Sequence, residues 1–519
     1  MVASDFVRNR IIRLIALALV AGAIGVTSAY VTFDHAQRSV VVGAHSTTVT
    51  ATFDGYATID FGPVLPRMRL PLDRPLGIGV NIDVGDSEVG SIEELIVKDA
   101  VIASQPEGEI AKVGETVNAM ARDALLRGIG AAALTAIFLV FAWHAVGEER
   151  RKSMLIRRPR GRELLIVGAT GAVIIAAAAL IAVPERPGES APEPQWVNLT
   201  SVFSNVPADP ILDRVEIAQG GASKTGNAII EGAIATYQTS TRFYGKLQQR
   251  AASAEVRKPQ NGQFTALVVT DRHDNVGMDP VAREIARAAE ANILLDLGDD
   301  TSTGGTWEEF SINSLARAFD GFDVIAVAGN HDNGPAIKES MKSNGFTVLA
   351  GEPVDVAGIR FLGASDPRSS GLTAGYSGNE SDSITAVSEQ DDQITKTACE
   401  DGNVSTILMH SPASATKASA SGCVDLVLTG HLHRQVGPTV EISPEGRRTI
   451  TFSNASTGGA VYAFALGSKL RRPAQVTIVT YEDGKPVGLQ PVDFVTSGSV
   501  DVQPYIDFAT LEQGPVPVQ

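Results

Sequence analysis

Apolar and polar positions follow a regular alternation along the second half of the chain. Apolar runs rich in β-type residues are separated by stretches of helical spacing at 280–291 and 311–319. The apolar runs occupy residues 264–270, 291–297, 322–328, 405–410 and 424–430. This strand–helix alternation predicts an α/β domain with a largely parallel or mixed sheet and helices outside it. On such sheets, functional sites form at the carboxyl ends of the strands.

The first half contains three uninterrupted apolar runs, at 11–30, 128–146 and 164–183. Each has about the 20 residues that a helix needs to cross a bilayer, so we expect three transmembrane helices. The first lies within residues 1–30. Basic residues precede it and Thr27-Ser28-Ala29 resembles a cleavage site, so a cleaved signal peptide is the alternative there.

Basic residues predict the orientation of these helices. The segment 147–163, between the second and third apolar runs, holds Arg150, Arg151, Lys152, Arg157, Arg158, Arg160 and Arg162. By the positive-inside rule, this loop and the N-terminus face the cytoplasm. The sequence therefore predicts a multi-pass protein of the cell membrane, in which residues 31–127 and everything after residue 183 are extracytoplasmic.

Residues 31–127 have the pattern of a small β-rich unit. Alternating residues on both sides of Asp54-Gly55 predict a two-residue hairpin, and 76–84 predicts another strand. Residues 109–127 predict an amphipathic helix that enters the membrane. This segment carries no catalytic spacing, so its role stays open.

A linker and a helical extension precede the α/β domain. Residues 184–197 are rich in Pro and Glu, which is typical of an extended linker. Residues 198–262 form the extension, and within it 222–255 carries an apolar stripe at helical spacing. That stripe predicts a helix packed on the α/β domain, with a lid over its site as the alternative.

The α/β domain itself is expected to span residues 263–495. Within it, 364–398 is rich in Ser, Gly and Asp and predicts a long polar insertion. Asp483-Gly484 predicts a hairpin turn. The tail, residues 496–519, shows no regular pattern.

Net charge limits the class of partner. The formal charge of −16 argues against binding of a nucleic acid polymer, because phosphate backbones need a basic face. It does not exclude a small phosphate ester, since bound metal cations can invert the local field of an acidic protein. The hydrophobic content of 44% agrees with a chain that lies partly in lipid.

The two cysteines, Cys399 and Cys423, both fall in the part predicted to face outward. Disulfides persist in oxidising compartments, so we expect these two to pair. Closing a loop of this length could contribute roughly 3 kcal/mol. Two unrelated thiols are the alternative.

Metal-ligand residue types end or follow each of the five apolar runs. The chain has eight histidines, and five of them lie in these segments. The candidate ligands are Asp271, His273, Asp299, Asn330, His410, His431 and His433. His331 and Asp332 follow Asn330 directly.

These residue types suit borderline divalent metals such as zinc, manganese or iron. Residues two apart on an extended segment point the same way, so Asp271 and His273 can reach one ion. Asp299 has two carboxylate oxygens and can bridge two ions. A metal pair can hold phosphate oxygens and create hydroxide from a bridging water at neutral pH. His331 is placed to protonate a leaving oxygen, with Asp332 able to orient its ring.

The ordered set of motifs over residues 264–485 resembles the calcineurin-like metallophosphoesterase superfamily. The resemblance implies a four-layer α/β/β/α sandwich with a dinuclear centre. It implies that one metal takes Asp271, His273, Asp299 and His433, and that the other takes Asp299, Asn330, His410 and His431. It also implies that His331 is the acid that assists the leaving group. Asp300, Thr301 and Ser302 depart from what relatives often carry, which leaves the substrate subclass open.

The sequence thus predicts a membrane-anchored phosphoesterase that uses two divalent ions and a metal-bridging hydroxide outside the cytoplasm. Its substrates would be phosphate mono- or diesters near the envelope, such as lipid-linked phosphates or nucleotides. The alternative is a non-catalytic envelope protein whose metal-bearing domain binds a phosphate-containing ligand or partner. Retention of His331 favours the enzyme, because a pure binder has no need of an acid.

Overall fold

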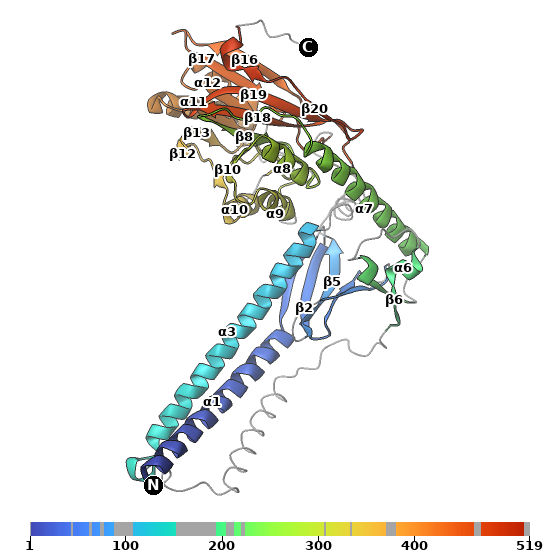
Figure 1. Ribbon diagram of the computed structural model, residues 1–519, viewed down its shortest axis with the longest axis vertical. Helices are drawn as coiled ribbons and strands as arrows, with labels where there is room; N and C mark the ends of the chain where they lie inside the picture. Colours follow the sequence, from blue (N-terminus) through green and yellow to red (C-terminus); the bar gives the residue numbers. More distant parts are fainter. Residues whose placement is uncertain are drawn as a thin grey trace. The chain divides into compact units, whose positions relative to one another are not determined.

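The chain divides into two compact units in the computed structural model, which is drawn in Figure 1. Unit 1 comprises Met1–Asp86 and Ala111–Ala228, and unit 2 comprises Ser87–Ile110 and Ile229–Gln519. The structure describes residues 2–42, 45–61, 65–72, 77–87, 107–151, 194–203, 212–219, 224–305, 308–332, 335–369, 380–460 and 469–512.

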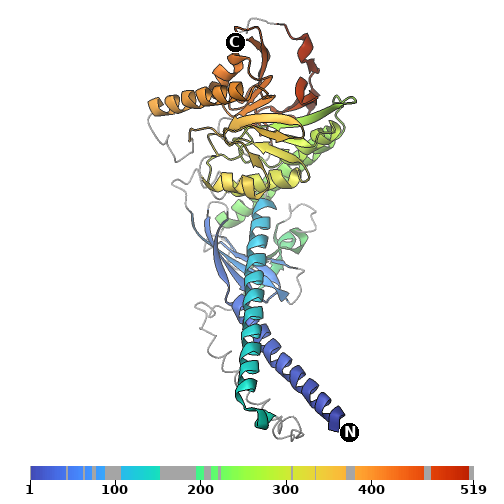
Figure 2. The same cartoon turned by 90° about the vertical axis from the view of Figure 1, so that its left-hand side faces the viewer.

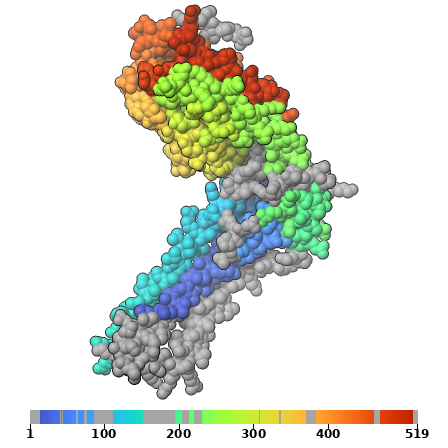
Figure 3. All heavy atoms as spheres, viewed as in Figure 1, coloured from blue at the N-terminus to red at the C-terminus, as the bar shows by residue number. Residues whose placement is uncertain are grey.

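Two long helices belong to unit 1: α1 (Val2–Asp34) and α3 (Glu107–Ala145). Their segments Leu17–Asp34 and Lys112–Ala145 are long and apolar enough to cross a membrane. Many of their large side chains are exposed, such as Val26 and Phe141 at 71% each, whereas Phe33, Val117 and Met120 are buried in the core of unit 1. Figure 3 shows α1 in blue and α3 in cyan on the surface of the molecule. These two helices suggest membrane association, whereas the predicted third helix at 164–183 lies outside the described residues.

α1 and α3 contact each other through small residues. A Cβ atom at Gly25 would lie 2.8 Å from Cβ of Ala132, and one at Gly128 would lie 2.7 Å from Cβ of Ala29. Two helix backbones can approach this closely only where side chains are small. Contacts of this kind are typical of helices that pack in lipid.

A seven-stranded sheet forms the rest of unit 1, in the order β1-β2-β5-β3-β4-β7-β6. Its strands are β1 (Gln37–Val42), β2 (His45–Thr52), β3 (Tyr56–Asp60), β4 (Met68–Pro71), β5 (Gly79–Ser87), β6 (Trp196–Asn198) and β7 (Glu216–Ala218). The two last strands come from residues that the sequence placed in the linker and the helical extension. Residues 196–198 and 216–218 therefore contribute to the sheet of unit 1.

The predicted hairpin around Asp54-Gly55 is wrong, because β5 lies between β2 and β3. The carboxylate of Asp54 accepts hydrogen bonds from Thr52 Oγ1 and from the backbone N–H of Tyr56, which stabilises a turn without pairing the two strands. Gly79 at the start of β5 lies against this turn, where a Cβ atom would clash with Asp54 and Thr52. β5, which comes later in the sequence, thus takes the place beside β2 that the predicted hairpin gives to β3.

Unit 2 contains two sheets. The first has the order β11-β10-β9-β8-β18-β19-β20, with β21 also paired to β19. Its strands are β8 (Gln263–Val269), β9 (Ile293–Asp296), β10 (Asp323–Ala326), β11 (Thr347–Val348), β18 (Ala474–Glu482), β19 (Lys485–Phe494), β20 (Val500–Val502) and β21 (Ile506–Asp507). Strands β8 to β11 are parallel, and β18 runs antiparallel to β8.

The second sheet has the order β12-β13-β14-β15-β17-β16. Its strands are β12 (Val354–Val356), β13 (Ile359–Ala364), β14 (Thr406–Met409), β15 (Leu426–Thr429), β16 (Val436–Ile442) and β17 (Arg448–Ser453). β13, β14, β15 and β17 are parallel. The prediction of a mixed α/β domain is confirmed.

Side chains of β8 alternate between two cores, as the period of a strand requires. Ala266 and Val268 join the cluster that both sheets share. Leu267 and Val269 join a cluster formed with α8 (Met278–Ala288), α9 (Glu309–Ala318) and α10 (Pro335–Ser343). A third cluster packs α11 (Glu380–Asp401) and α12 (Thr416–Ser421) on the second sheet. Figure 2 shows the helices of unit 2 beside its strands.

The predicted helix at 222–255 is α7 (Lys224–Ala251). Its residues Tyr244, Leu247 and Ala251 are buried in the cluster with α8 and the first sheet. The C-terminal part of the helix, with Phe243 and Leu247 of the predicted stripe, thus packs on the α/β domain as expected.

Two segments of unit 2 are more regular than the sequence predicted. α11 begins inside the predicted insertion 364–398, and its Ile394 and Ala398 are buried. The helix is missed because its exposed face is rich in Ser and Asp. In the tail 496–519, β20 and β21 pair with β19, so an apparently irregular segment completes a sheet.

A disulfide joins Cys399 of α11 to Cys423, just after α12. The pairing predicted from the sequence is confirmed. It closes a segment of 24 residues that contains β14 and its following turn.

Candidate metal centre

The predicted ligands lie at the carboxyl ends of parallel strands of unit 2. Asp271 and His273 follow β8, Asp299 follows β9, and Asn330 follows β10. On the second sheet, His410 follows β14, and His431 and His433 follow β15. Asp271, His273, Asp299, Asn330 and His410 are at most 3% exposed. Segments that are far apart in the sequence are thereby brought to one place.

Asp271, His273 and His433 form the first group of metal-ligand atoms, all within 4.8 Å of one another. His273 Nε2 lies 3.1 Å from His433 Nε2, and His433 Nε2 lies 3.1 Å from Asp271 Oδ1. Two imidazole nitrogens and one carboxylate oxygen thus face a common point.

Asp299, His410 and His431 form the second group. His410 Nε2 lies 3.1 Å from Asp299 Oδ2 and 3.2 Å from His431 Nδ1. The same Asp299 oxygen lies 3.9 Å from His273 Nε2 of the first group. Asp299 therefore stands between the two groups, as a bridging ligand would.

Backbone carbonyls fix the orientation of two of the rings. His273 Nδ1 lies 3.2 Å from Thr301 O, and His410 Nδ1 lies 2.8 Å from Leu297 O. A ring whose Nδ1–H donates to a carbonyl presents the lone pair of Nε2 on its other side. Both Nε2 atoms are those that face the carboxylates.

Five of the seven predicted ligands have left-handed backbone conformations. The φ angles are 49° for Asp271, 45° for His273, 57° for Asp299, 68° for His431 and 51° for His433. Such residues cost about 1–3 kcal/mol each, and they gather at functional sites where other contacts enforce them. The turns after the strands therefore carry strain that aims these side chains inward.

Charge and burial oppose each other at the centre. Burial raises the pKa of Asp299. Burial also acts to lower the pKa of His410, but the charge of Asp299 outweighs it and raises that pKa to about 10. Burial and the charge of His410 lower the pKa of His431 to about 4. When no metal is bound, a proton on His410 thus offsets the charge of the neighbouring Asp299 carboxylate.

Divalent cations fit this donor set. Asp271 Oδ1 is buried, and the basic groups that lie within 4.0 Å of it in the described part of the chain are the imidazoles of His273 and His433. Cations would replace the protons that the histidines carry, and mixed imidazole–carboxylate sets suit zinc, iron or manganese.

His331 and Asp332 take different places. His331 Nδ1 lies 2.8 Å from Ser302 O, and the ring is 5.2 Å from that of His273. The carboxylate of Asp332 instead accepts hydrogen bonds from the backbone N–H groups of Asp300, Thr301 and Gly329. The prediction that Asp332 orients the His331 ring is wrong, because backbone donors of the neighbouring turns occupy its oxygens.

The sequence analysis missed the buried ion pairs behind the centre. Arg272, between two predicted ligands, is fully buried and donates to Asp279, Asp300 and Ser311. Its bond to Asp300 Oδ1, 3.1 Å long, ties the turn after β8 to the turn after β9. An arginine at the end of an apolar strand is the signal that could have indicated this buried pair.

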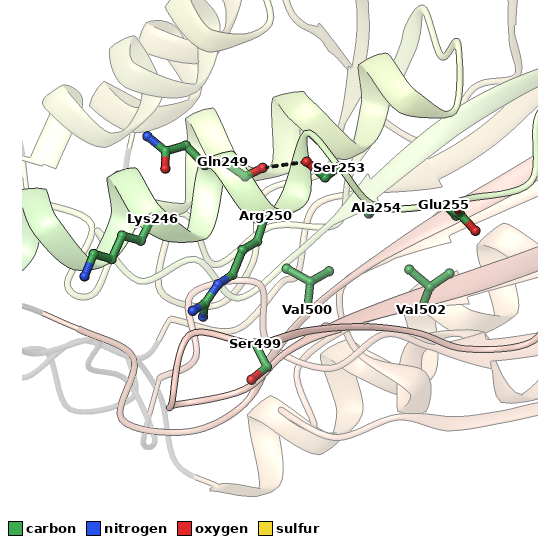
Figure 4. Close-up of a pocket in the computed structure, with 9 residues that line it drawn as sticks. All are labelled: Lys246, Gln249, Arg250, Ser253, Ala254, Glu255, Ser499, Val500 and Val502. Atoms are coloured by element: carbon green, nitrogen blue, oxygen red, sulfur yellow. Dashed lines mark hydrogen bonds between the residues drawn. The ribbon is translucent and has the colours of Figure 1, made fainter.

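A pocket of about 670 Å³ lies elsewhere in unit 2. It is bounded by the end of α7 and by β20, with Lys246, Arg250, Ser499, Val500 and Val502 among its lining residues, as Figure 4 shows. None of its lining residues is a predicted ligand, so it is separate from the metal centre.

The fold and the two ligand groups define a metal-binding α/β domain. A family model, calcineurin-like phosphoesterase, matches residues 264–435, which contain all seven predicted ligands. Residues 264–435 of the chain thus form a calcineurin-like phosphoesterase domain. No curated protein matches the chain.

Two solved structures are similar to part of the chain. One, described as a novel archaeal phosphodiesterase, is 15% identical, with a TM-score of 0.25, and the match covers 42% of this chain and 93% of that one. The other, TT1561 of Thermus thermophilus, is 10% identical, with a TM-score of 0.26, and the match covers 42% of this chain and 99% of that one.

Proposed function

We propose that the chain is a membrane-anchored phosphoesterase that hydrolyses phosphate mono- or diesters outside the cytoplasm with two divalent metal ions. The observation that carries this proposal is the pair of ligand groups joined by Asp299, within a calcineurin-like phosphoesterase domain. One ion would be held by Asp271, His273, Asp299 and His433. The other would be held by Asp299, Asn330, His410 and His431.

Such a metal pair, when bound, supplies a nucleophile from water at neutral pH and neutralises phosphate charge. Around it, the chain fixes the ligands through the carbonyls of Leu297 and Thr301. His331 would protonate the departing oxygen: its Nδ1–H faces Ser302 O, which leaves Nε2 to carry the transferred proton. The ring is partly exposed, so a substrate can reach it.

The proposed domain, residues 263–495, would have the four-layer α/β/β/α arrangement implied by the family resemblance. Its three side-chain clusters, one shared by the sheets and one on the helical side of each, support this. For localisation, α1, α3 and the apolar run 164–183 would span the membrane, with the basic segment 147–163 inside. The Cys399–Cys423 disulfide supports an oxidising, extracytoplasmic location.

Hydrolysis of model esters tests the proposal. We would assay the full chain in detergent with bis-p-nitrophenyl phosphate and p-nitrophenyl phosphate, with manganese, zinc or iron and with EDTA. We expect metal-dependent turnover that EDTA abolishes and that Asp299→Ala lowers by at least about a hundredfold, since each bound metal contributes several kcal/mol. Asp425→Ala, which removes a surface ion pair with Lys485, serves as control. Bound metal without turnover on either ester would favour the non-catalytic binding protein instead.

A further inference from the structure

The loop after β13 lies at the same sheet edge as the second ligand group. β13 is parallel to β14 and places Ala364 opposite Met409, the residue before His410. The backbone N–H of Asp366 donates to Ala328 O at 2.8 Å, and Ala328 N–H donates to Ser365 Oγ at 3.2 Å. Ala328 directly precedes the segment with Asn330 and His331. The loop is thus fixed between two ligand-bearing strand ends.

A guanidinium is held rigidly on this loop. Arg368 Nε donates to Asp366 Oδ1 at 2.9 Å, and Nη2 donates to Oδ2 at 2.6 Å. The Asp366 side chain is fully buried and that of Arg368 is 16% exposed. A two-point pair of this kind fixes the plane of the guanidinium as well as its position.

The pair lies at the edge of the second sheet that carries the second ligand group. Arg368 and Asp366 follow the end of β13, and His410 follows the end of the neighbouring parallel strand β14. A guanidinium held there is close to the place where a phosphate oxygen on the second ion would lie.

We propose that Arg368 binds a non-bridging oxygen of the substrate phosphate beside the ion of the second group. This rests on the proposed function. A guanidinium matches the geometry of phosphate oxygens and keeps its charge at any working pH, so it is suited to this role. Asp366 then acts as a positioning residue that holds Arg368 in place.

Arg360 offers a matched control on the same strand. It lies near the start of β13, the end opposite to the site, and pairs with Asp355 and Asp401. Replacing it also removes an arginine–carboxylate pair from β13. It should therefore reproduce any loss of stability without touching phosphate binding.

Binding of inorganic phosphate provides the test. The full chain in detergent, saturated with Mn²⁺, is titrated with orthophosphate by calorimetry, and its metal content is measured. We expect Arg368→Met to weaken phosphate binding about tenfold to a hundredfold, as loss of a charged hydrogen bond does. Arg368→Lys should be intermediate and Arg360→Met unchanged. In ester hydrolysis, KM should rise in Arg368→Met by a larger factor than kcat falls.

Each result of these measurements supports or contradicts one of the two proposals, the role of Arg368 or the hydrolase activity. Equal phosphate affinity in Arg368→Met and the parent, or no phosphate binding by the parent, overturns the role of Arg368. If Arg368→Met loses its bound metal, the phosphate affinity of Arg368→Lys, which must keep its metal, is compared with that of the parent instead. Equal affinities would again overturn the role of Arg368. A chain that binds phosphate through Arg368 but hydrolyses neither ester contradicts the proposed hydrolase alone.

Discussion

His331 and Asp332 are neighbours in sequence with separate roles. His331 contacts Ser302 O and is partly exposed, whereas Asp332 is fully buried and accepts hydrogen bonds from three backbone N–H groups and Thr301 Oγ1. The first is suited to proton transfer and the second to holding the turns. Replacing His331 should therefore lower activity, whereas replacing Asp332 should lower stability.

We expect His331→Asn to lower kcat by about a hundredfold or more while two metal ions stay bound, because a general acid contributes about 10²–10⁴. Asp332→Ala should instead lower the free energy of unfolding by about 3 kcal/mol, since several buried donors lose their acceptor. Urea unfolding and metal analysis check both. A His331→Asn chain with parental kcat would contradict the acid role, and a parental stability in Asp332→Ala would contradict the structural one.

His410 gives the metal-free chain a pH-dependent stability. Burial opposes its charge, but Asp299 raises its folded pKa to about 10 from an ordinary value of 6.5. A raised pKa stabilises the folded state fully below about pH 6.5, and this contribution is lost as the pH rises through about 10. We expect the melting temperature in EDTA to fall between pH 7 and 10.

With Mn²⁺ the pH dependence should reverse. Metal ligands must be deprotonated, so binding strengthens as pH rises. We expect the melting temperature with Mn²⁺ to hold or rise between pH 7 and 9. Parallel pH profiles with and without EDTA would mean that His410 does not bind a metal.

At the scale of elements, the five strands that end in candidate metal ligands could be predicted from the sequence. The pairing and packing of several other elements could not. Each apolar run, such as 264–270, carries a strong local signal, and the observed strand β8 (Gln263–Val269) differs by one residue at each end. β5, which is distant in sequence, pairs with β2 in place of β3. The local pattern around Asp54-Gly55 therefore predicted a hairpin that does not form. α11 was missed because burial of Ile394 and Ala398 depends on the second sheet.

In the candidate site, too, features with a local sequence signal were predictable and features that depend on packing were not. Candidate ligands could be predicted from the spacing of Asp, Asn and His after strands, and the structure brings six of the seven together in two groups. The ion pair of Arg272 with Asp300, and that of Arg368 with Asp366, join residues whose approach depends on the packed turns or on loop geometry. No sequence pattern specifies those contacts.

The disulfide is the covalent link between α11 and the segment after α12. Its loop spans 24 residues, so loop closure predicts a contribution of about 3 kcal/mol. We expect the double variant Cys399→Ala/Cys423→Ala to lose about that much unfolding free energy, measured in urea, while it still binds metal. The same loss on reduction of the parent chain is the control. An unchanged stability would show that the link contributes nothing.

At the scale of the whole molecule, α1 and α3 carry the proposed membrane attachment. Leu134 and Phe138 of α3 are 69% and 67% exposed, which suits contact with lipid. A lysine at the bilayer centre costs about 2.5–3.5 kcal/mol. We therefore expect Leu134→Lys/Phe138→Lys to release part of the chain from membranes washed with alkaline carbonate.

Glu148→Lys, beyond the apolar segment Lys112–Ala145, is the matched control and should stay in the membrane fraction. If both variants and the parent wash off equally, the two helices do not anchor the chain.

The central claim is that two metal ions share Asp299 in one hydrolytic centre. The most direct measurement is metal content per chain, by mass spectrometry of the full chain in detergent, read together with ester hydrolysis as Mn²⁺ is added back after EDTA. The account predicts about two ions per chain at saturation, with turnover that follows metal occupancy. A chain that stops at one ion, or turnover that proceeds with no ion bound, would contradict it.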